Sequence, residues 1–217
     1  MKRLLDLVLS VVGIIFGLPL GIIICLVIYL NDRKSVFYRQ ERVGKYGRVF
    51  KGYQFRSMVP DADNDTGPFQ ATENDPRVTG IGRLIRITAI DELPQLLNIF
   101  KGEMSFVGPR ALRLEEKEVG GSKVVSVFDY PDFKERCSVS PGLTGVAQVL
   151  LPRDAPRKVK FKYDIWYIKN QSLWLDAYLI FISFLVTFQG KWETRLDKLS
   201  FLTKNFKERI ANEIYEN

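Results

Sequence analysis

The chain has 217 residues, a formal net charge of +7 at pH 7, no histidine and two cysteines, Cys25 and Cys137. The length fits one domain, the lack of histidine excludes a histidine general base or a Ser-His-Asp triad, and two distant cysteines exclude a disulfide framework or a zinc site. The basic balance is typical of a protein with an anionic partner: a nucleic acid, an acidic lipid or a nucleotide-linked substrate.

Residues 4–30 form one long apolar segment. As a straight helix it would be about 40 Å long, against about 30 Å of bilayer hydrocarbon, so it can reach across a membrane. Pro19 removes a backbone hydrogen bond in mid-segment and predicts a kink. Basic residues flank both ends and favour the cytoplasmic side, so the residues alone leave two possibilities: a kinked transmembrane helix, or a re-entrant helix with both ends on one side. Glycines recur every four residues, a weak sign of close packing, at Gly13, Gly17 and Gly21.

Residues 35–58 carry two apolar runs around a glycine-containing turn at 44–47 and predict a β-hairpin. After it, Asp61 and Asp63 stand in an acidic stretch that lacks the glycine and the glutamate of an EF-hand. One interpretation of this pair is the Asp-x-Asp metal site of a nucleotide-sugar glycosyltransferase. A solvated acidic loop is the favoured interpretation.

Asp91 and Glu92 stand side by side at the start of a predicted amphipathic helix. Pro94 suits the first helical turn, apolar residues follow at helical spacing, and Gly102 ends the run. The helix dipole favours ionised carboxylates at this end, and arginines stand on both sides of the pair. An ionised carboxylate near arginines is a candidate nucleophile or magnesium ligand for phosphate chemistry. Taken alone, helix capping is the commoner role of acids at such a position.

The second half of the chain is predicted to be mostly helical. Residues 112–136 are charged and predict a helix. Residues 157–167 combine basic and aromatic side chains, which fits base stacking on a nucleic acid or a membrane interface. Residues 173–188 are apolar but short for a span, which indicates an interfacial or buried helix. The charged tail keeps helical spacing and predicts a surface helix packed on the domain.

Four stretches make up a long and specific pattern: Tyr-Gln-Phe-Arg-Ser-Met at 53–58, Asp-Glu-Leu-Pro-Gln at 91–95, Lys-Gly-Glu-Met-Ser-Phe-Val-Gly-Pro-Arg at 101–110, and Ser-Pro-Gly-Leu-Thr-Gly-Val-Ala-Gln-Val at 140–149. This pattern resembles the signature of the bacterial sugar transferases, and more narrowly that of the small monotopic polyprenyl-phosphate phosphoglycosyl transferases. The chain departs from it in three places: Gln54 replaces the usual lysine, Leu18 replaces the serine that often precedes the membrane-segment proline, and Leu-Leu-Pro-Arg at 150–153 replaces Asn-Gly-Arg.

The resemblance implies an α+β, mostly helical fold with a small β-hairpin. It divides the chain into a re-entrant, helix-break-helix membrane segment at 1–30, a cytosolic catalytic domain at 31–190 and a charged amphipathic helix at 191–217. The break falls at Leu18 and Pro19, and amphipathic helices lie at the membrane interface. The expected location is the bacterial inner membrane, with the catalytic domain on its cytosolic face.

The implied reaction moves a sugar 1-phosphate from a UDP-sugar to polyprenyl phosphate, usually undecaprenyl phosphate, and releases UMP. It is the first membrane step of lipid-linked glycan synthesis. Asp91 is expected to form a covalent phosphosugar intermediate, Glu92 to act as metal ligand or proton acceptor, and both to hold Mg²⁺. The expected phosphate-binding residues are Arg56, Arg86, Arg110 and, in place of the missing Asn-Gly-Arg arginine, Arg153.

The expected partners are the UDP-sugar, polyprenyl phosphate, membrane lipid, downstream glycosyltransferases and a second copy of the chain in a homodimer, and no nucleic acid. Other function classes remain open at this point. One is a membrane-anchored, metal-dependent glycosyltransferase that uses Asp61 and Asp63 and releases UDP. Another is a non-catalytic membrane scaffold in which Asp91 and Glu92 are only caps. A third is a basic nucleic-acid binder, which would show steeply salt-dependent binding.

Overall fold

The structure, a computed structural model, describes residues 1–60, 62, 75–117, 124–152, 155–188 and 195–215. Its α-helices are α1 (Lys2–Asp32), α2 (Gly80–Ile87), α3 (Leu96–Lys101), α4 (Phe133–Arg136), α5 (Val146–Leu150), α6 (Arg157–Lys169), α7 (Leu173–Phe188) and α8 (Arg195–Tyr215). Its 3-10 helices are η1 (Lys45–Gly47), η2 (Ile90–Gln95) and η3 (Val127–Asp129). Its strands are β1 (Phe37–Val43), β2 (Val49–Phe55), β3 (Ser105–Val107), β4 (Glu115–Lys117), β5 (Val124–Ser126) and β6 (Gly142–Thr144).

Within the described ranges the strands pair two by two. Strands β1 and β2 form the predicted hairpin, antiparallel, with Val43 opposite Val49 at the turn and Phe37 opposite Phe55 at the open end. Strands β4 and β5 are also antiparallel, whereas β3 and β6 are parallel. The predicted α+β, mostly helical class with small sheets is therefore confirmed.

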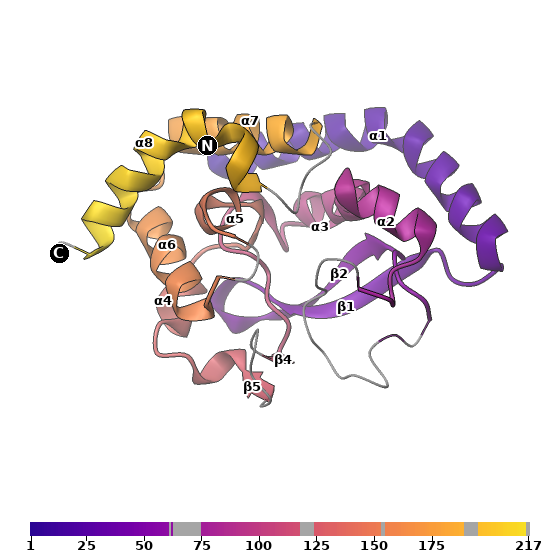
Figure 1. Cartoon of the computed structure of the whole chain (residues 1–217), viewed down its shortest axis with the longest axis horizontal. Helices are drawn as coiled ribbons and strands as arrows, with labels where there is room; N and C mark the ends of the chain where they lie inside the picture. Colours follow the sequence, from indigo (N-terminus) through magenta and orange to yellow (C-terminus); the bar gives the residue numbers. More distant parts are fainter. Residues whose placement is uncertain (61, 63–74, 118–123, 153–154, 189–194, 216–217) are drawn as a thin grey trace.

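Helix α1 lies along one side of the domain and changes direction along its length (Figure 1). It packs on η2 and α3 through its glycines: a Cβ on Gly13 would lie 3.0 Å from Leu96 Cδ1, and one on Gly17 would lie 3.1 Å from Leu93 Cδ1. The close packing that the glycine spacing predicts is therefore confirmed. Because η2 and α3 in turn contact β2, they are held between α1 and the hairpin.

Helix α1 turns its polar residues toward the domain and its apolar residues outward. Asp6 and Ser10 are buried, whereas Phe16 is 79% exposed and Ile15 and Leu18 are also exposed. A helix on a water-soluble surface shows the opposite arrangement. Since α1 is also long and apolar enough to cross a membrane, its outward face indicates contact with lipid.

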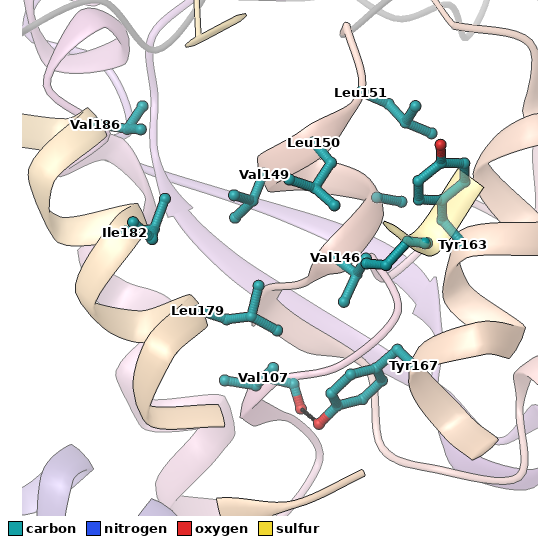
Figure 2. Close-up of a cluster of buried hydrophobic side chains, with 12 residues drawn as sticks. Val107, Val146, Val149, Leu150, Leu151, Tyr163, Tyr167, Leu179, Ile182 and Val186 are labelled. Atoms are coloured by element: carbon teal, nitrogen blue, oxygen red, sulfur yellow. Dashed lines mark hydrogen bonds between the residues drawn. The ribbon is translucent and has the colours of Figure 1, made fainter. Parts of the chain in front are cut away.

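Among the described residues, the largest buried cluster joins α5, α6, α7 and α8 to the end of β3 (Figure 2). In it, the hydroxyl of Tyr167 lies 2.6 Å from its acceptor Asp176 Oδ1 and 3.3 Å from the carbonyl O of Val107. Lys2 Nζ donates to Asp176 Oδ2 at 2.6 Å, so the first turn of α1 reaches this cluster. Burial, and then the hydrogen bond to Asp176, raise the pKa of Tyr167, and the hydroxyl remains protonated. Ile210 of α8 is fully buried here, so the C-terminal helix belongs to the same core.

Residues 112–136 do not form the predicted helix. Where the structure describes this range, at 112–117 and 124–136, the chain makes β4, β5 and the 3-10 helix η3, and its one α-helix is the four-residue α4. The prediction is wrong because charge alone does not make a helix. The adjacent glycines at 120–121 and the proline at 131 oppose a continuous one.

Three of the four aromatic side chains of α6 are buried, and the fourth, Trp166, is partly buried and donates to Glu213. Phe161, Tyr163 and Tyr167 are all buried, so base stacking and a membrane interface are both wrong interpretations of these three residues. They lie on two sides of α6: Phe161 packs with Val127 and Tyr130, whereas Tyr163 and Tyr167 belong to the cluster of α5, α7 and α8. Helix α7 buries one face of its apolar surface and exposes the other, where Trp174 is 87% exposed and Phe184 is also exposed.

Candidate active site

The acid pair lies in the first turn of η2, directly after a sharp change of chain direction. Ala89, the residue before η2, has φ 52° and ψ 17°, in the left-handed region. For an alanine this conformation costs about 1–2 kcal/mol, and it lets Asp91 follow the end of α2 within a few residues. The predicted single helix is in fact a 3-10 turn containing Pro94, continued by α3. Gly102, at φ 86°, ends α3 as predicted.

A second local structure is a close backbone contact between the 101–110 and 140–149 stretches. A Cβ on Gly142 would lie 2.1 Å from Gly108 N, and one on Gly145 would lie 2.2 Å from Gly108 O. No side chain fits there, so glycine at these positions lets β3 and β6 pair at full approach. The contact continues as a parallel bridge between Arg110 and Gly142. It fixes the backbone from which the Arg110 side chain extends.

A shallow, open pocket lies where the hairpin, η2 and this glycine contact meet. Its lining includes Arg42, Gly52, Gln54, Glu92, Gln95, Met104, Arg110, Ala111, Gly142 and Leu143. Glu92 Oε1 and Arg110 Nη2 are 3.6 Å apart. This is longer than a hydrogen bond, so the pair is held by charge attraction, and either group can take another partner.

Arg136 holds the backbone of Arg110. Its Nη2 donates to the carbonyl O of Arg110 at 2.6 Å, and its Nε donates to Asp164 Oδ2 at 2.8 Å. Arg136 is 4% exposed and Asp164 is 3% exposed, and the guanidinium also lies 4.7 Å from the centroid of the Phe161 ring. Sequence reasoning missed this pair, because nothing local marks an arginine whose partner stands on another helix.

The other arginines predicted to bind phosphate lie in different surroundings. Arg56 Nη2 is 2.5 Å from Asp32 Oδ1, an ion pair that joins the hairpin to the end of α1. Arg86 lies in α2, near Asp75. Hydrogen bonds from Arg77 are the main reason why the pKa of Asp75 is lowered, and the charge of Arg86 adds to the effect.

Some predicted site residues lie outside the described part of the chain. These are Arg153 and the two acids of the alternative metal site, Asp61 and Asp63. Sequence reasoning also overlooked Arg42, which in the sequence is only one of several basic residues after the membrane segment. The structure places it in the pocket together with Glu92 and Arg110.

The carboxylates of Asp91 and Glu92 are oxygen donors of the kind that Mg²⁺ prefers. Among the described residues, no group of three or more Asp, Glu, Cys or His side chains is placed to hold a metal. Mg²⁺, however, is commonly bound by one or two carboxylates together with the phosphates of a substrate. Asp91 and Glu92, adjacent in one turn, are a donor set of this kind.

Residues 1–190 match the sequence profile of a family described as bacterial sugar transferase. The chain is similar to the exopolysaccharide production protein PSS of Rhizobium leguminosarum bv. phaseoli, with 36% identity over 186 residues, covering 83% of this chain and 92% of the relative. It is also similar to the undecaprenyl-phosphate galactose phosphotransferase of Salmonella typhimurium, with 35% identity over 195 residues, covering 83% of this chain and 39% of the relative.

A third relative is the UDP-glucose:undecaprenyl-phosphate glucose-1-phosphate transferase of Klebsiella pneumoniae, with 36% identity over 195 residues, covering 88% of this chain and 40% of the relative. The chain thus spans about two fifths of the length of the Salmonella and Klebsiella proteins and nearly all of the Rhizobium one. The chain therefore belongs to the bacterial sugar transferase family.

Proposed function

We propose that this chain transfers a sugar 1-phosphate from a UDP-sugar to a polyprenyl phosphate such as undecaprenyl phosphate, and releases UMP. The observation that carries the proposal is Glu92 beside Arg110 at a pocket, with Asp91 next to Glu92 in the same turn although it does not line the pocket itself. The outward apolar face of α1 adds a membrane attachment to this domain. The names of the Salmonella and Klebsiella relatives support the substrates, since both contain undecaprenyl phosphate and one contains UDP-glucose.

In the proposed reaction Asp91 is the nucleophile. Its carboxylate attacks the β-phosphorus of the UDP-sugar, the bond from that phosphorus to the bridging oxygen breaks, and UMP leaves with the oxygen. The phosphosugar is then joined to Asp91 as an acyl phosphate. A phosphate oxygen of the lipid attacks the same phosphorus and releases Asp91. Because the lipid phosphate is already an oxyanion, the transfer needs no histidine base, which agrees with a chain without histidine.

The charged groups around Asp91 neutralise the diphosphate. Arg110 leaves Glu92 and clamps phosphate oxygens in a bidentate manner. Mg²⁺, held by Asp91 and Glu92 together with the diphosphate, would screen its negative charge. Glu92 alternatively accepts a proton. In this proposal Arg86 and Arg153 add to the clamp, and Arg56 does so after exchanging Asp32 for phosphate.

The test is an exchange reaction without lipid acceptor. If Asp91 holds the phosphosugar between two displacements, radiolabelled UMP will enter the UDP-sugar pool when enzyme, UDP-sugar and Mg²⁺ are mixed alone. With undecaprenyl phosphate added, chromatography will show UMP and not UDP as the product. Exchange that requires the lipid would contradict the covalent step. Release of UDP would favour the metal-dependent glycosyltransferase.

We further propose that α1 is re-entrant and that the continuous helix bends at Leu18 and Pro19. Both ends of the helix bind the same domain, which supports this topology. At the start, Arg3 donates to the carbonyl oxygens of Ile99 and Phe100 at 2.6 and 2.7 Å. At the end, Asp32 pairs with the hairpin. A helix that crossed the bilayer would leave one end on the far side, out of reach of these contacts.

Cysteine labelling measures this topology. In a Cys25→Ser/Cys137→Ser background, a cysteine added before Met1 and a Lys34→Cys substitution are both expected to react with a membrane-impermeant maleimide in inside-out vesicles only, because both ends of α1 face the cytosol. Labelling of the two positions from opposite sides of the membrane would mean that α1 spans it.

A further inference from the structure

The pocket contains an arginine that the proposed clamp does not use. Arg42 of β1 lines the pocket together with Glu92 and Arg110. Its Nη1 donates to the carbonyl O of Ala111 at 3.1 Å. Ala111 directly follows Arg110, so two guanidinium groups meet at one short segment, one from the hairpin and one from the chain after β3.

The side chain of Arg42 is held at its stem as well as at its tip. A Cβ on Gly52 would lie 3.3 Å from Arg42 Cγ. Gly52 pairs with Gln40 across the hairpin, so Arg42 is its diagonal neighbour. The stem therefore crosses β2 where that strand has no side chain. An arginine fixed at both ends before a ligand arrives loses less conformational freedom on binding.

The charges of the pocket suit a phosphate-bearing ligand. Among its lining residues in the described chain, two arginines stand against one carboxylate, Glu92. The planar guanidinium group matches phosphate oxygens in a bidentate manner. Gly52 and Gly142 leave backbone open at the wall, where a ligand can approach closely.

We infer that Arg42 is a substrate-binding residue that contacts the diphosphate of the nucleotide sugar, positioned by Gly52 and by the carbonyl of Ala111. This inference rests on the proposed function for the identity of the substrate. It adds to Arg110 a second arginine, which comes from the hairpin. It also gives the hairpin, otherwise a structural element, a direct part in holding the donor.

The experiment compares two competing ligands that differ only in phosphate. Inhibition of UMP release by UDP and by uridine is measured for the wild type, Arg42→Gln and Arg42→Lys. Arg42→Gln should raise KM for the UDP-sugar and Ki for UDP by about 10- to 100-fold, the loss expected for one charge-assisted contact. Ki for uridine should stay within about twofold of the wild-type value, because uridine has no phosphate for Arg42 to contact. Arg42→Lys keeps the positive charge but cannot bind phosphate in a bidentate manner, so its KM and Ki for UDP should lie between those of wild type and Arg42→Gln.

Arg39→Gln is the matched control. Arg39 stands on the same strand but on its other face, 5.7 Å from the centroid of the Tyr53 ring. It should leave both inhibition constants unchanged. Gly52→Ala, which brings a methyl group against the Arg42 stem, should raise the inhibition constant of UDP more than that of uridine.

Equal increases for UDP and uridine, or no change in either, would overturn the inference. If Arg42→Gln fails to fold, Arg42→Lys and Gly52→Ala decide by the same comparison. The proposed function can fail separately, through the absence of UMP exchange in the wild type. In that case direct calorimetric binding of UDP and uridine to wild type and variants still decides the role of Arg42.

Discussion

Asp91→Asn is expected to reduce UMP release by at least about a thousandfold, because an amide cannot replace a carboxylate as the attacking group. Both the overall transfer and the lipid-free exchange of UMP should be lost together. Asparagine has nearly the size of aspartate, and Ala89 rather than Asp91 precedes η2, so the start of η2 and the melting temperature should be retained. Lost activity with retained stability therefore separates a nucleophile from the capping role of the scaffold alternative.

Mass spectrometry provides the positive counterpart of this loss. Wild-type protein quenched with UDP-sugar should carry the phosphosugar mass on the peptide that contains Asp91. Glu92→Gln is the neighbouring control: it removes one negative charge beside Arg110 and should lower the rate while leaving the labelled peptide detectable. Retained exchange in Asp91→Asn, or label on another peptide, would assign the nucleophile elsewhere.

Arg136→Met should give the largest loss of stability among the substitutions discussed. It leaves the buried carboxylate of Asp164 without its partner at 2.8 Å, and breaking such a pair costs about 3–5 kcal/mol in free energy of unfolding. Denaturant titration in detergent measures this loss. The double variant Arg136→Met/Asp164→Leu should recover most of the stability, since it removes the uncompensated charge. Its UMP release should remain below wild type, because the carbonyl of Arg110 has lost the donor that holds it.

The control is an exposed ion pair between the same two helices, α4 and α6. Lys169 Nζ lies 3.6 Å from Glu135 Oε1, and both side chains are largely in solvent. Lys169→Met should change the free energy of unfolding by less than about 1 kcal/mol. If Lys169→Met and Arg136→Met lower the free energy of unfolding equally, burial of the Arg136–Asp164 pair does not add to its contribution to stability.

The features predicted correctly from the sequence depend on local patterns. The hairpin follows from two apolar runs around a turn, the end of α3 from Gly102, and the packing of α1 from glycines at regular spacing. Each needs only residues close together in the chain. The split of the predicted helix into η2 and α3 was not predictable in this way, because it depends on Ala89 adopting a left-handed conformation that alanine rarely takes.

In the candidate site, local reasoning identified Glu92 and Arg110, and the structure brings them to one pocket. It could not show that Arg56 is paired with Asp32, a residue 24 positions earlier. Local reasoning also could not show that the side chain of Arg42 passes over Gly52 into the pocket. Long-range pairing decides whether an arginine faces a substrate or another side chain, and one sequence contains no record of such pairing. The same limit applies to Phe161, Tyr163 and Tyr167 of α6, which are buried although the composition around them suggests a surface.

The attachment of α1 has a consequence for engineering this protein. Asp6 Oδ1 accepts hydrogen bonds from Ser105 Oγ and Phe106 N at 3.0 and 2.9 Å, so the hydrophobic helix satisfies donors on the strand that leads to Arg110. A tethering segment that merely holds a protein at a bilayer can be trimmed or swapped for another. Removing α1 here would leave Ser105 and Phe106 of the β3 region without their acceptor and would expose Leu93 and Leu96. A truncated version would therefore lose packing and hydrogen bonds of the domain as well as its membrane attachment.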